Sequence, residues 1–482
     1  MNAVKRHTGG QGAPRRLNVE RLEDRCLLAE FFVDPGGDDA NSGSLAAPFE
    51  SIQHGLDVAT SPGDIVTVRA GTYREHVEFP ASGSAASGHI TLRSFAGERP
   101  KLDATGMSAD HMVLIENKSF VKLIGFEITG LAGANDHSGV RIEGAGTNIE
   151  IRNNKIHDLR GASAMGVTVY GTSTRAPVAN LVIDGNEIYD SEPAPSEALT
   201  LNGNVTAFEV TNNLIHDVNN IGIDLIAGER DINRRYGARN GVVRGNEVYR
   251  ARSTYEDGFA AGIYIDGASD IILENNIVHE NDVGIEVGAE NRGVTASRNI
   301  VRNNLIYEND KAGLGFGGYA RNRGRVRYSS FVNNTVYKND TLGAGFGQLW
   351  IQYASNNVVT SNIFWASENQ VLIASDAGNV QNVVDYNLYF SGADAATAEF
   401  TWNRRESAGF ATYRAATRQD SHSQFSDPLF VSAAAADFQL QAGSPAIGAG
   451  SHTTGQFAPK DFAGVTRPQG AAPDVGAFER RV

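Results

Sequence analysis

Residues 262–307 read GIYIDGASDIILENNIVHENDVGIEVGAENRGVTASRNIVRNNLIY, and two short patterns each occur twice within them. The first is Gly-Ile-Tyr-Ile at 262–265, which returns as Gly-Ile-Glu-Val at 284–287. The second is Asn-Asn-Ile-Val-His at 275–279, which returns as Asn-Asn-Leu-Ile-Tyr at 303–307. Short runs that alternate with period two and are bounded by Gly and Asn are typical of β-strands.

The Asn pattern extends through most of the chain and defines an internal repeat. Its aligned residues follow one another at intervals of 27 to 33 residues: Asn154, Asn186, Asn213, Asn246, Asn276, Asn304, Asn334 and Asn362. Each repeat therefore forms one coil of two or three strands, and stacked coils pair like strands in parallel about 4.8 Å apart. Asn tolerates the left-handed turn between strands and can bond to the Asn of the next coil. With the handedness of β-crossovers, the repeat predicts an all-β, single-stranded, right-handed parallel β-helix.

The ends of the chain are predicted to close this solenoid. Residues 51–59 (SIQHGLDVA) form an amphipathic pattern that predicts a short N-terminal capping helix over the open edge of the first coil. We expect a basic tail or export tag at 1–29, the cap and first coils at 30–105, the parallel β-helix at 106–395, and a closing segment at 396–482.

The composition excludes several classes of function. The 482 residues are 41% hydrophobic and carry a net charge of −14, which is a globular composition whose charge repels nucleic-acid phosphates. No apolar run approaches 18 residues, so no membrane span is expected. One Cys excludes an internal disulfide framework and a Cys-cluster metal site. We expect a monomer that binds no nucleic acid.

Four outward-facing residues on neighbouring coils form the predicted catalytic group. Alternate side chains of a strand face opposite ways, so the polar positions of the Gly-led strands must point outward: Asp224, Tyr264, Asp266 and Glu286. The strand spacing puts the Cα atom of Asp224 about 10 Å and that of Asp266 about 8 Å from the Cα atom of Glu286. Carboxyl groups roughly 6.5–9.5 Å apart suit inverting glycosidases, and crowding raises the pKa of one of them. The alternative is an acidic ladder without a catalytic role.

Polar residues around this group predict binding functions. Thr200 and Asn202 occupy the same outward positions at an earlier coil. Arginines in two insertions suit the carboxylate or sulfate groups of an acidic glycan. The predicted substrate-binding residues are therefore Thr200, Asn202, Arg230, Arg234, Arg321 and Arg323. Acidic residues before the strands offer oxygen ligands for Ca²⁺, so a calcium site is predicted at Glu197, Glu256 and Asp257.

Motifs at both ends carry a family resemblance. Residues 31–35 (FFVDP), 65–73 (IVTVRAGTY), 443–448 (GSPAIG) and 473–479 (PDVGAFE) resemble those of secreted right-handed parallel β-helix proteins of the pectate-lyase-like superfamily. Residues 16–29 (RLNVERLEDRCLLA) resemble the N-terminal export tag of planctomycete proteins. The resemblance implies an extracellular or cell-surface protein that acts on a polysaccharide.

The resemblance can be followed into the predicted site. The strand 284–288 resembles the strand that carries the lysine base of β-helical pectate lyases, with Glu286 at the position of that lysine. Residues 219–224 resemble the calcium segment of these lyases and keep only its last Asp, and residues 256–259 form a second partial match. Three functions stay open: a lyase acting on an acidic polysaccharide with Ca²⁺, a glycoside hydrolase that uses Asp224, Asp266 and Glu286, and a non-catalytic adhesive β-helix.

Overall fold

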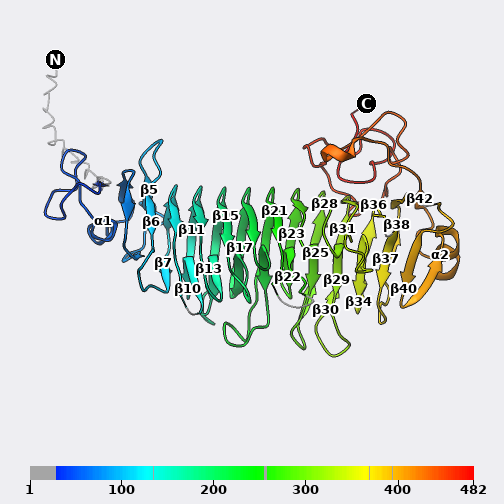
Figure 1. Ribbon diagram of the computed structural model, residues 1–482, viewed down its shortest axis with the longest axis horizontal. Helices are drawn as coiled ribbons and strands as arrows, with labels where there is room; N and C mark the ends of the chain where they lie inside the picture. The colour runs from blue at the N-terminus through cyan, green and yellow to red at the C-terminus, as the bar shows by residue number, and fades with distance from the viewer. Residues whose placement is uncertain (1–28, 134, 255–257, 369, 393, 482) are drawn as a thin grey trace, which may run out of the picture.

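The chain forms the predicted right-handed parallel β-helix with a short N-terminal capping helix (Figure 1). The structure is a computed structural model that describes residues 29–481 apart from residues 134, 255–257, 369 and 393. The predicted export tag therefore lies almost entirely outside the described residues. Each coil contributes one strand to each of three long sheets, which we call sheets I, II and III.

Sheet I carries the Gly-led strands, which pair in parallel except for the last two, which are antiparallel. Its strands are β4 (Val77–Glu78), β7 (His111–Glu116), β10 (His137–Glu143), β13 (Ala164–Gly171), β16 (Leu199–Gly203), β19 (Ile223–Ile226), β22 (Ala261–Asp266), β25 (Val283–Gly288), β29 (Ala312–Gly317), β33 (Leu349–Gln352), β37 (Val371–Ser375), β40 (Glu399–Trp402) and β41 (Arg405–Ala408).

Sheet II precedes the Asn motifs, and three short strands extend it toward sheet I. Its main strands are β1 (Glu30–Val33), β2 (Ile65–Val68), β5 (Ile90–Ser94), β8 (Val121–Ile124), β11 (Gly146–Arg152), β14 (Val178–Asp184), β17 (Val205–Thr211), β20 (Arg239–Arg244), β23 (Ser269–Glu274), β27 (Ile300–Arg302), β31 (Ser330–Val332), β35 (Val358–Thr360) and β38 (Val383–Asp385). The three short strands are β26 (Thr295–Ser297), β30 (Arg325–Arg327) and β34 (Ala354–Ser355).

Sheet III follows the Asn motifs and completes each coil. Its strands are β3 (Thr72–Tyr73), β6 (Lys101–Asp103), β9 (Glu127–Thr129), β12 (Lys155–His157), β15 (Glu187–Ser191), β18 (Leu214–Val218), β21 (Glu247–Ala251), β24 (Ile277–His279), β28 (Leu305–Tyr307), β32 (Thr335–Tyr337), β36 (Ile363–Trp365), β39 (Leu388–Phe390) and β42 (Gln424–Phe425). The apolar positions of all three sheets point inward and form one continuous buried core.

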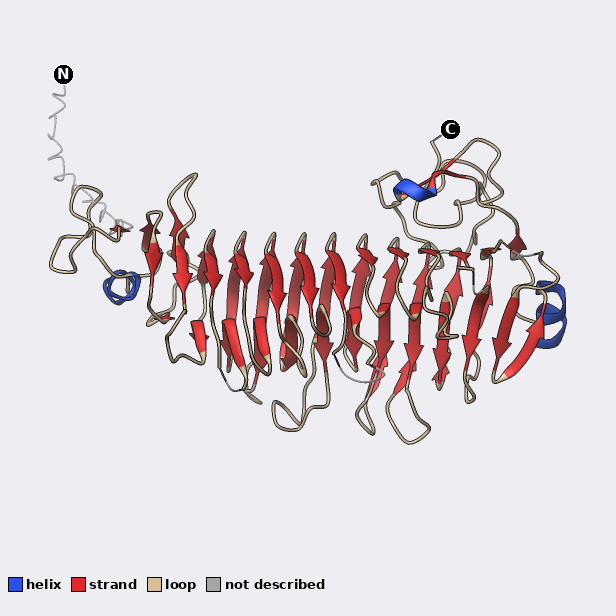
Figure 2. Ribbon diagram, in the orientation of Figure 1, coloured by secondary structure: helices blue, strands red, loops and turns tan. Residues whose placement is uncertain are grey.

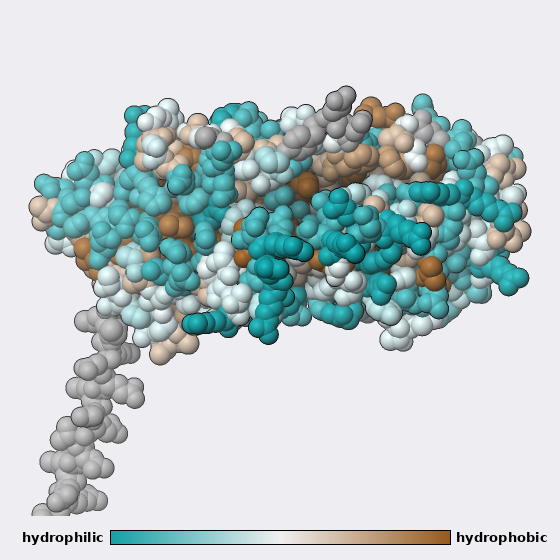
Figure 3. All heavy atoms as spheres, turned by 90° about the horizontal axis from the view of Figure 1, so that it is seen from below, coloured by the Kyte–Doolittle hydropathy of each residue, from teal (hydrophilic) through white to brown (hydrophobic). Residues whose placement is uncertain are grey.

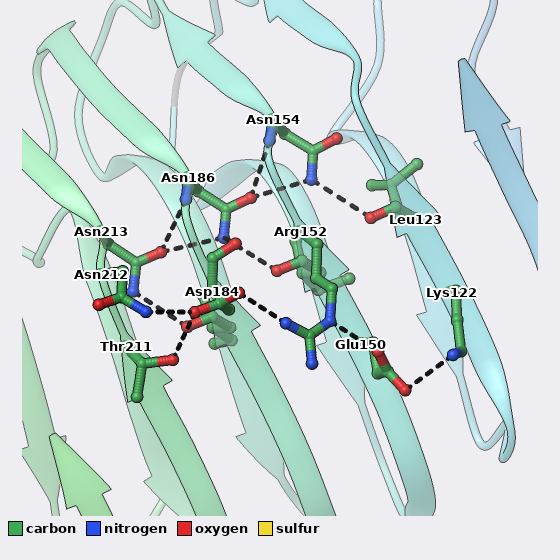
Figure 4. Close-up of polar contacts among 12 residues, drawn as sticks. Lys122, Leu123, Glu150, Arg152, Asn154, Asp184, Asn186, Thr211, Asn212 and Asn213 are labelled. Atoms are coloured by element: carbon green, nitrogen blue, oxygen red, sulfur yellow. Dashed lines mark hydrogen bonds and ion pairs between the residues drawn. The ribbon is translucent and has the colours of Figure 1, made fainter. Parts of the chain in front are cut away.

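The repeated asparagines form a buried ladder between sheets II and III (Figure 4). The backbone N–H and the side-chain Nδ2 of Asn154 both donate to Oδ1 of Asn186, each at 3.0 Å. Asn186 donates in the same way to Asn213. The pattern continues coil by coil as far as Asn387. Because each side chain satisfies buried backbone groups of two coils, the ladder fixes the register that stacks the strands.

The residue before each ladder Asn makes the turn. Asn153, Asn212 and Asn275 have φ values of 56°, 54° and 57°, which lie in the left-handed region, and Gly185 takes the same role with a φ of 67°. Left-handed backbone is least costly for Gly and Asn. The two residues of the motif therefore have different roles: the first makes the turn, and the second bonds to the next coil.

The outer face of sheet III carries a stack of alternating His and Tyr rings. Successive ring centroids lie 4.7 to 5.2 Å apart along the series His157, Tyr189, His216, Tyr249, His279 and Tyr307. The stack ends at Phe438, which belongs to a C-terminal segment at residues 427–481. That segment contains β43 (Phe430–Ser432), a 3₁₀ turn (Ala433–Ala435) and β44 (Asp437–Leu440), and it packs on β28, β32 and β36.

Helices close both ends of the solenoid (Figure 2). Helix α1 (Ile52–Val58) buries Ile52, Gly55 and Leu56 against the first coil, and α2 (Phe410–Thr417) buries Phe410 and Tyr413 against the last one. Neither of these helices, nor any other helix in the described ranges, is long and apolar enough to cross a bilayer.

Candidate functional site

The structure brings the four predicted catalytic residues together on the outer face of sheet I. Asp224 on β19 lies in register with Tyr264 on β22, and Tyr264 lies in register with Glu286 on β25. The same row continues through Gly315 on β29 to Trp350 on β33. Asp224, Tyr264 and Asp266 are 3%, 6% and 6% exposed, so these polar groups are almost removed from solvent, whereas Glu286 is half-buried.

Two further glutamates reach this row from the loops that follow the strands. The backbone N–H of Glu290 donates to Oδ1 of Asp266 at 2.8 Å, and the hydroxyl of Tyr264 donates to Oε1 of Glu290 at 3.4 Å. On the other side, Nδ2 of Asn202 donates to Oε2 of Glu229 at 2.6 Å. We call the six carboxyl groups that lie here the acidic cluster: Glu197, Asp224, Glu229, Asp266, Glu286 and Glu290.

Burial and mutual repulsion raise the pKa of most of these carboxyl groups toward or above neutral pH. Burial, together with the nearby Glu290 and Asp266, raises the pKa of Glu286 to about 8. Burial and the nearby Glu290 raise the pKa of Asp266 to about 7, although the N–H that it accepts acts in the opposite direction. The pKa of Asp224 lies well above its ordinary range because of burial and the neighbouring Glu197. Carboxyl groups that titrate near neutral pH are what acid–base catalysis requires.

Glycines beside Glu286 leave room for large neighbouring side chains. A Cβ at Gly288 would lie 2.6 Å from the hydroxyl of Tyr264, and a Cβ at Gly315 would lie 3.2 Å from Cε3 of Trp350. The phenol and the indole therefore extend over backbone that carries no side chain, on either side of Glu286. These rings exclude part of the water around the carboxyl group, and burial is the largest cause of its raised pKa.

A pocket of about 410 Å³ opens beside Glu286, and we call it the aromatic pocket. It is lined by Tyr264, Glu286, Glu290, Tyr319, Phe346, Trp350 and Phe259, among others. The Phe259 ring stacks on Trp350 at a centroid distance of 5.8 Å, and Phe346 lies 4.6 Å from the same indole. Figure 3 shows the molecule from the side of the long loops, where a more hydrophobic band lies within a mostly hydrophilic surface.

The predicted substrate-binding residues occupy three different settings. Thr200 is fully buried in register with Asp224, and Asn202 is 2% exposed and bonds to Glu229, so both lie beside carboxyl groups of the acidic cluster and are closed off from solvent. Arg230 and Arg234 are exposed on the loop after β19, and among the described residues no ion pair joins either one to the cluster.

The other two predicted arginines lie on the loop after β29. Arg323 lies over Tyr319 with its guanidinium carbon 5.0 Å from the ring centroid, and its charge lowers the pKa of Glu290, which burial raises more strongly. Arg321 lines a second pocket beyond the aromatic one.

The predicted calcium ligands are Glu197, Glu256 and Asp257. Glu256 and Asp257 lie outside the described residues. Burial and the nearby Glu229 raise the pKa of Glu197 to about 8, whereas a calcium ligand must be ionised. Within the described ranges, no group of three His, Cys, Asp or Glu residues is arranged to hold a metal ion. The calcium site stays a prediction.

Sequence reasoning found Tyr264 but missed Glu229, Glu290 and three other aromatic residues of the pocket, Tyr319, Phe346 and Trp350. Trp350 could have been found, because Leu349-Trp350-Ile351-Gln352 keeps the period-two pattern even though it lacks the leading Gly. The two glutamates stand five and four residues after Asp224 and Glu286, in loops whose course the repeat does not define.

Comparisons with known proteins agree with the fold. The family described as "Pel9A-like, right handed beta helix region" matches residues 31–192, and the family described as "Disaggregatase related" matches residues 205–348. The crystal structure of pectate lyase Pel9A is similar to the chain, with a TM-score of 0.51 and 16% sequence identity. The match covers 94% of this chain and 96% of Pel9A. The fold is therefore that of a pectate-lyase-like right-handed parallel β-helix, and this chain carries an acidic cluster on its outer face.

Sequence relatives identify the family more narrowly. The Bacillus subtilis protein named "Uncharacterized protein YwoF" is 34% identical over 432 residues, which cover 86% of this chain and 92% of YwoF. The chain belongs to the YwoF family. Pectate lyase PEL9 of Emericella nidulans is 33% identical over 96 residues, which cover 19% of this chain and 23% of PEL9.

Proposed function

We propose that the protein is an extracellular enzyme that cleaves glycosidic bonds of a polysaccharide at the acidic cluster. The observation that carries this proposal is the pairing of carboxyl groups that titrate near neutral pH with an aromatic pocket. Glycosidic cleavage needs an acid that protonates the leaving oxygen and a second carboxylate. The likeness to pectate-lyase-like β-helices supports a site of action outside the cell.

Hydrolysis is the form of cleavage that the geometry favours. Glu286 faces the aromatic pocket and holds its proton at neutral pH because its pKa is about 8, so it is the proposed general acid. Asp266, with a pKa of about 7, ionises more easily and is the proposed base that activates water, although it is 6% exposed and does not itself line the aromatic pocket. Their positions on adjacent strands, two residues apart, separate their Cα atoms by about 8 Å. An inverting mechanism needs roughly 6.5–9.5 Å between the carboxyl groups themselves, a spacing that this strand register allows.

The aromatic pocket is the proposed binding site for the sugar rings. Tyr264, Trp350 and Phe259 offer flat apolar surfaces, and a sugar ring has one face made mostly of C–H groups. Glu290 accepts the Tyr264 hydroxyl, which holds the phenol beside Glu286. This arrangement would position the scissile bond over the glycines of β25 and β29.

A lyase is the second candidate, since the Pel9A-like match and the arginines both suit an acidic substrate. β-Elimination requires a base for the proton beside the uronate carboxyl group, and a positive charge on that carboxyl group. The described residues that line the aromatic pocket include no Lys, Arg or His, although Arg323 lies over its Tyr319 ring and Lys311 over its Phe259 ring. Tyr264 is a poor base, because burial and the charge of Glu286 raise its pKa well above the ordinary value. The Pel9A-like match also ends at residue 192, before the first strand of the site.

Product analysis would test the proposal. The enzyme is incubated with uronate, sulfated and neutral polysaccharides, with and without chelator. Hydrolysis yields reducing ends without ultraviolet absorbance, whereas elimination also yields an absorbing double bond. We expect Glu286→Gln and Asp266→Asn to abolish product formation, and Glu209→Gln, at an exposed glutamate of β17, to leave it unchanged. Absorbing products that disappear with chelator would establish the calcium-dependent lyase, and no product on any glycan would favour an adhesive role.

A further inference from the structure

A second pocket, of about 740 Å³, lies beyond the aromatic pocket over the short strands β30 and β34. Four arginines and one tyrosine line it together with small and polar residues: Arg321, Arg325, Arg327, Arg404 and Tyr353. We call it the arginine pocket. Such a concentration of positive charge is unexpected in a chain whose net charge is −14.

Most of this positive charge has no carboxylate partner among the described residues. Elsewhere on the solenoid, surface arginines pair with carboxylates, as in Arg152–Asp184 and Arg298–Asp270, both at 2.6 Å. Among the described residues no ion pair includes Arg321, Arg325 or Arg327, although Arg404 lies 3.3 Å from Asp376. Three neighbouring guanidinium groups without a counter-charge favour an anionic ligand.

The strand geometry directs these groups into one place. Val326 is fully buried in the core, so the side chains of Arg325 and Arg327, on either side of it, both point outward from β30. The guanidinium carbon of Arg325 lies 5.9 Å from the centroid of the Tyr353 ring. Gly378 leaves room for that ring, because a Cβ there would lie 2.8 Å from Cδ1 of Tyr353. An apolar ring beside forked N–H donors suits a sugar that carries a carboxylate or sulfate group.

Two chain segments border both pockets. Tyr319 lines the aromatic pocket and Arg321 lines the arginine pocket, and Gln352 and Tyr353 are divided in the same way. Arg404 follows β40, which lies four strands beyond the β25 strand of Glu286 in sheet I. Four strand spacings amount to about 19 Å, a distance that one polysaccharide chain of several sugars can span.

We propose that the arginine pocket binds the carboxylate or sulfate groups of an acidic polysaccharide whose chain continues into the aromatic pocket. The second part of this inference rests on the proposed function, because it takes the aromatic pocket as the place of cleavage. The first part, anion binding, stands on the arginines themselves and can be measured without turnover.

Binding measurements on the full chain carrying Glu286→Gln would test the proposal. The probes are labelled oligogalacturonate, chondroitin sulfate oligosaccharide, neutral xylo-oligosaccharide and single-stranded oligo-dT. Replacing Arg325 and Arg327 together by Gln should lower the affinity for the two acidic glycans about tenfold or more and weaken its salt dependence. Arg175→Gln, at an exposed arginine in the loop between β13 and β14, is the matched control and should change neither. If the double variant loses its fold, Arg321→Gln on an exposed loop gives the same test.

The outcomes separate this inference from the proposed function. Unchanged affinity for acidic glycans in the double variant would overturn the arginine pocket, as would oligo-dT binding of equal strength and equal sensitivity. Lost affinity for acidic glycans, with no cleavage by the wild-type enzyme, would support the arginine pocket and refute the hydrolase. Cleavage of neutral glycans without any binding of acidic ones would support the hydrolase and refute the arginine pocket.

Discussion

Replacing Glu286 by Gln tests the raised pKa on which the proposed chemistry depends. The unfolded chain releases this proton near the ordinary value of 4.5, whereas the folded chain holds it until about pH 8. The folded state therefore binds more protons than the unfolded state between these values, and stability falls as the pH rises through that window. Below pH 4.5 both states are protonated, and this contribution is constant.

The size of the effect follows from the two pKa values. The difference between 4.5 and about 8 corresponds to about 4–5 kcal/mol at most. Glu286 is half-buried beside an open pocket, so water screens part of the cost, and we expect about 1–3 kcal/mol at pH 8. Gln has the same shape and cannot ionise, so the variant should unfold about 2 °C above the wild-type protein at pH 8 and together with it at pH 4.

Thermal unfolding at pH 4, 6 and 8 measures this difference, with Glu209→Gln as the control for loss of a surface charge. A gap between wild type and Glu286→Gln that does not change with pH would mean that Glu286 is already ionised in the folded protein. Glu286 could then not act as the general acid at neutral pH. The same pKa values predict an activity optimum between about pH 7, where Asp266 ionises, and about pH 8, where Glu286 loses its proton.

Three further substitutions test other parts of the structure. Phe259→Ala should raise KM about tenfold with little change in stability, because its ring is 38% exposed and stacks on Trp350. Asn246→Ala removes a buried side chain that makes four ladder hydrogen bonds, and chemical denaturation should show a loss of about 3 kcal/mol. Glu479→Ala removes the carboxylate that pairs with the buried Arg467 and leaves only Asp461 and Asp474 to offset its charge; this should cost about 3 kcal/mol, seen as faster hydrogen exchange in residues 427–481.

Each of these tests has a result that contradicts it. Unchanged KM in Phe259→Ala would remove the aromatic pocket from substrate binding. A stability loss in Asn246→Ala no larger than that of Asn322→Ala, at an exposed loop position, would show that the ladder contributes little. Uniformly faster exchange along the whole solenoid in Glu479→Ala would show that the C-terminal segment does not unfold as a separate unit.

The repeat made both the fold and the outward row of the site predictable. Inward apolar residues alternate with outward polar ones, so once the Gly-led segments are aligned, Asp224, Tyr264 and Glu286 must share one wall. The structure has this register. The ladder was also predicted, but not the division between a turn-forming residue and a bonding residue, which depends on backbone angles.

The loops set the limit of what could be predicted. Glu229, Glu290 and Phe259 lie outside the strands, and their directions depend on contacts such as the one between Tyr264 and Glu290. The arginine pocket shows the same limit at longer range. The run from Arg321 to Arg327 is visible in the sequence, but Arg404 joins it only because β40 stacks beyond β33 and β37.

The architecture also explains how the fold tolerates the destabilising acidic cluster. Burying several carboxyl groups costs stability, and in a small domain that cost would threaten the whole fold. In this solenoid each coil is held by its neighbours through the inner core and the Asn ladder, neither of which includes the outward row. The acidic cluster lies on β16, β19, β22, β25 and their loops, far from both ends, where fraying starts. Neutralising Glu286 should therefore change the stability of the middle coils more than that of the terminal ones, and hydrogen exchange resolved by coil would detect the difference.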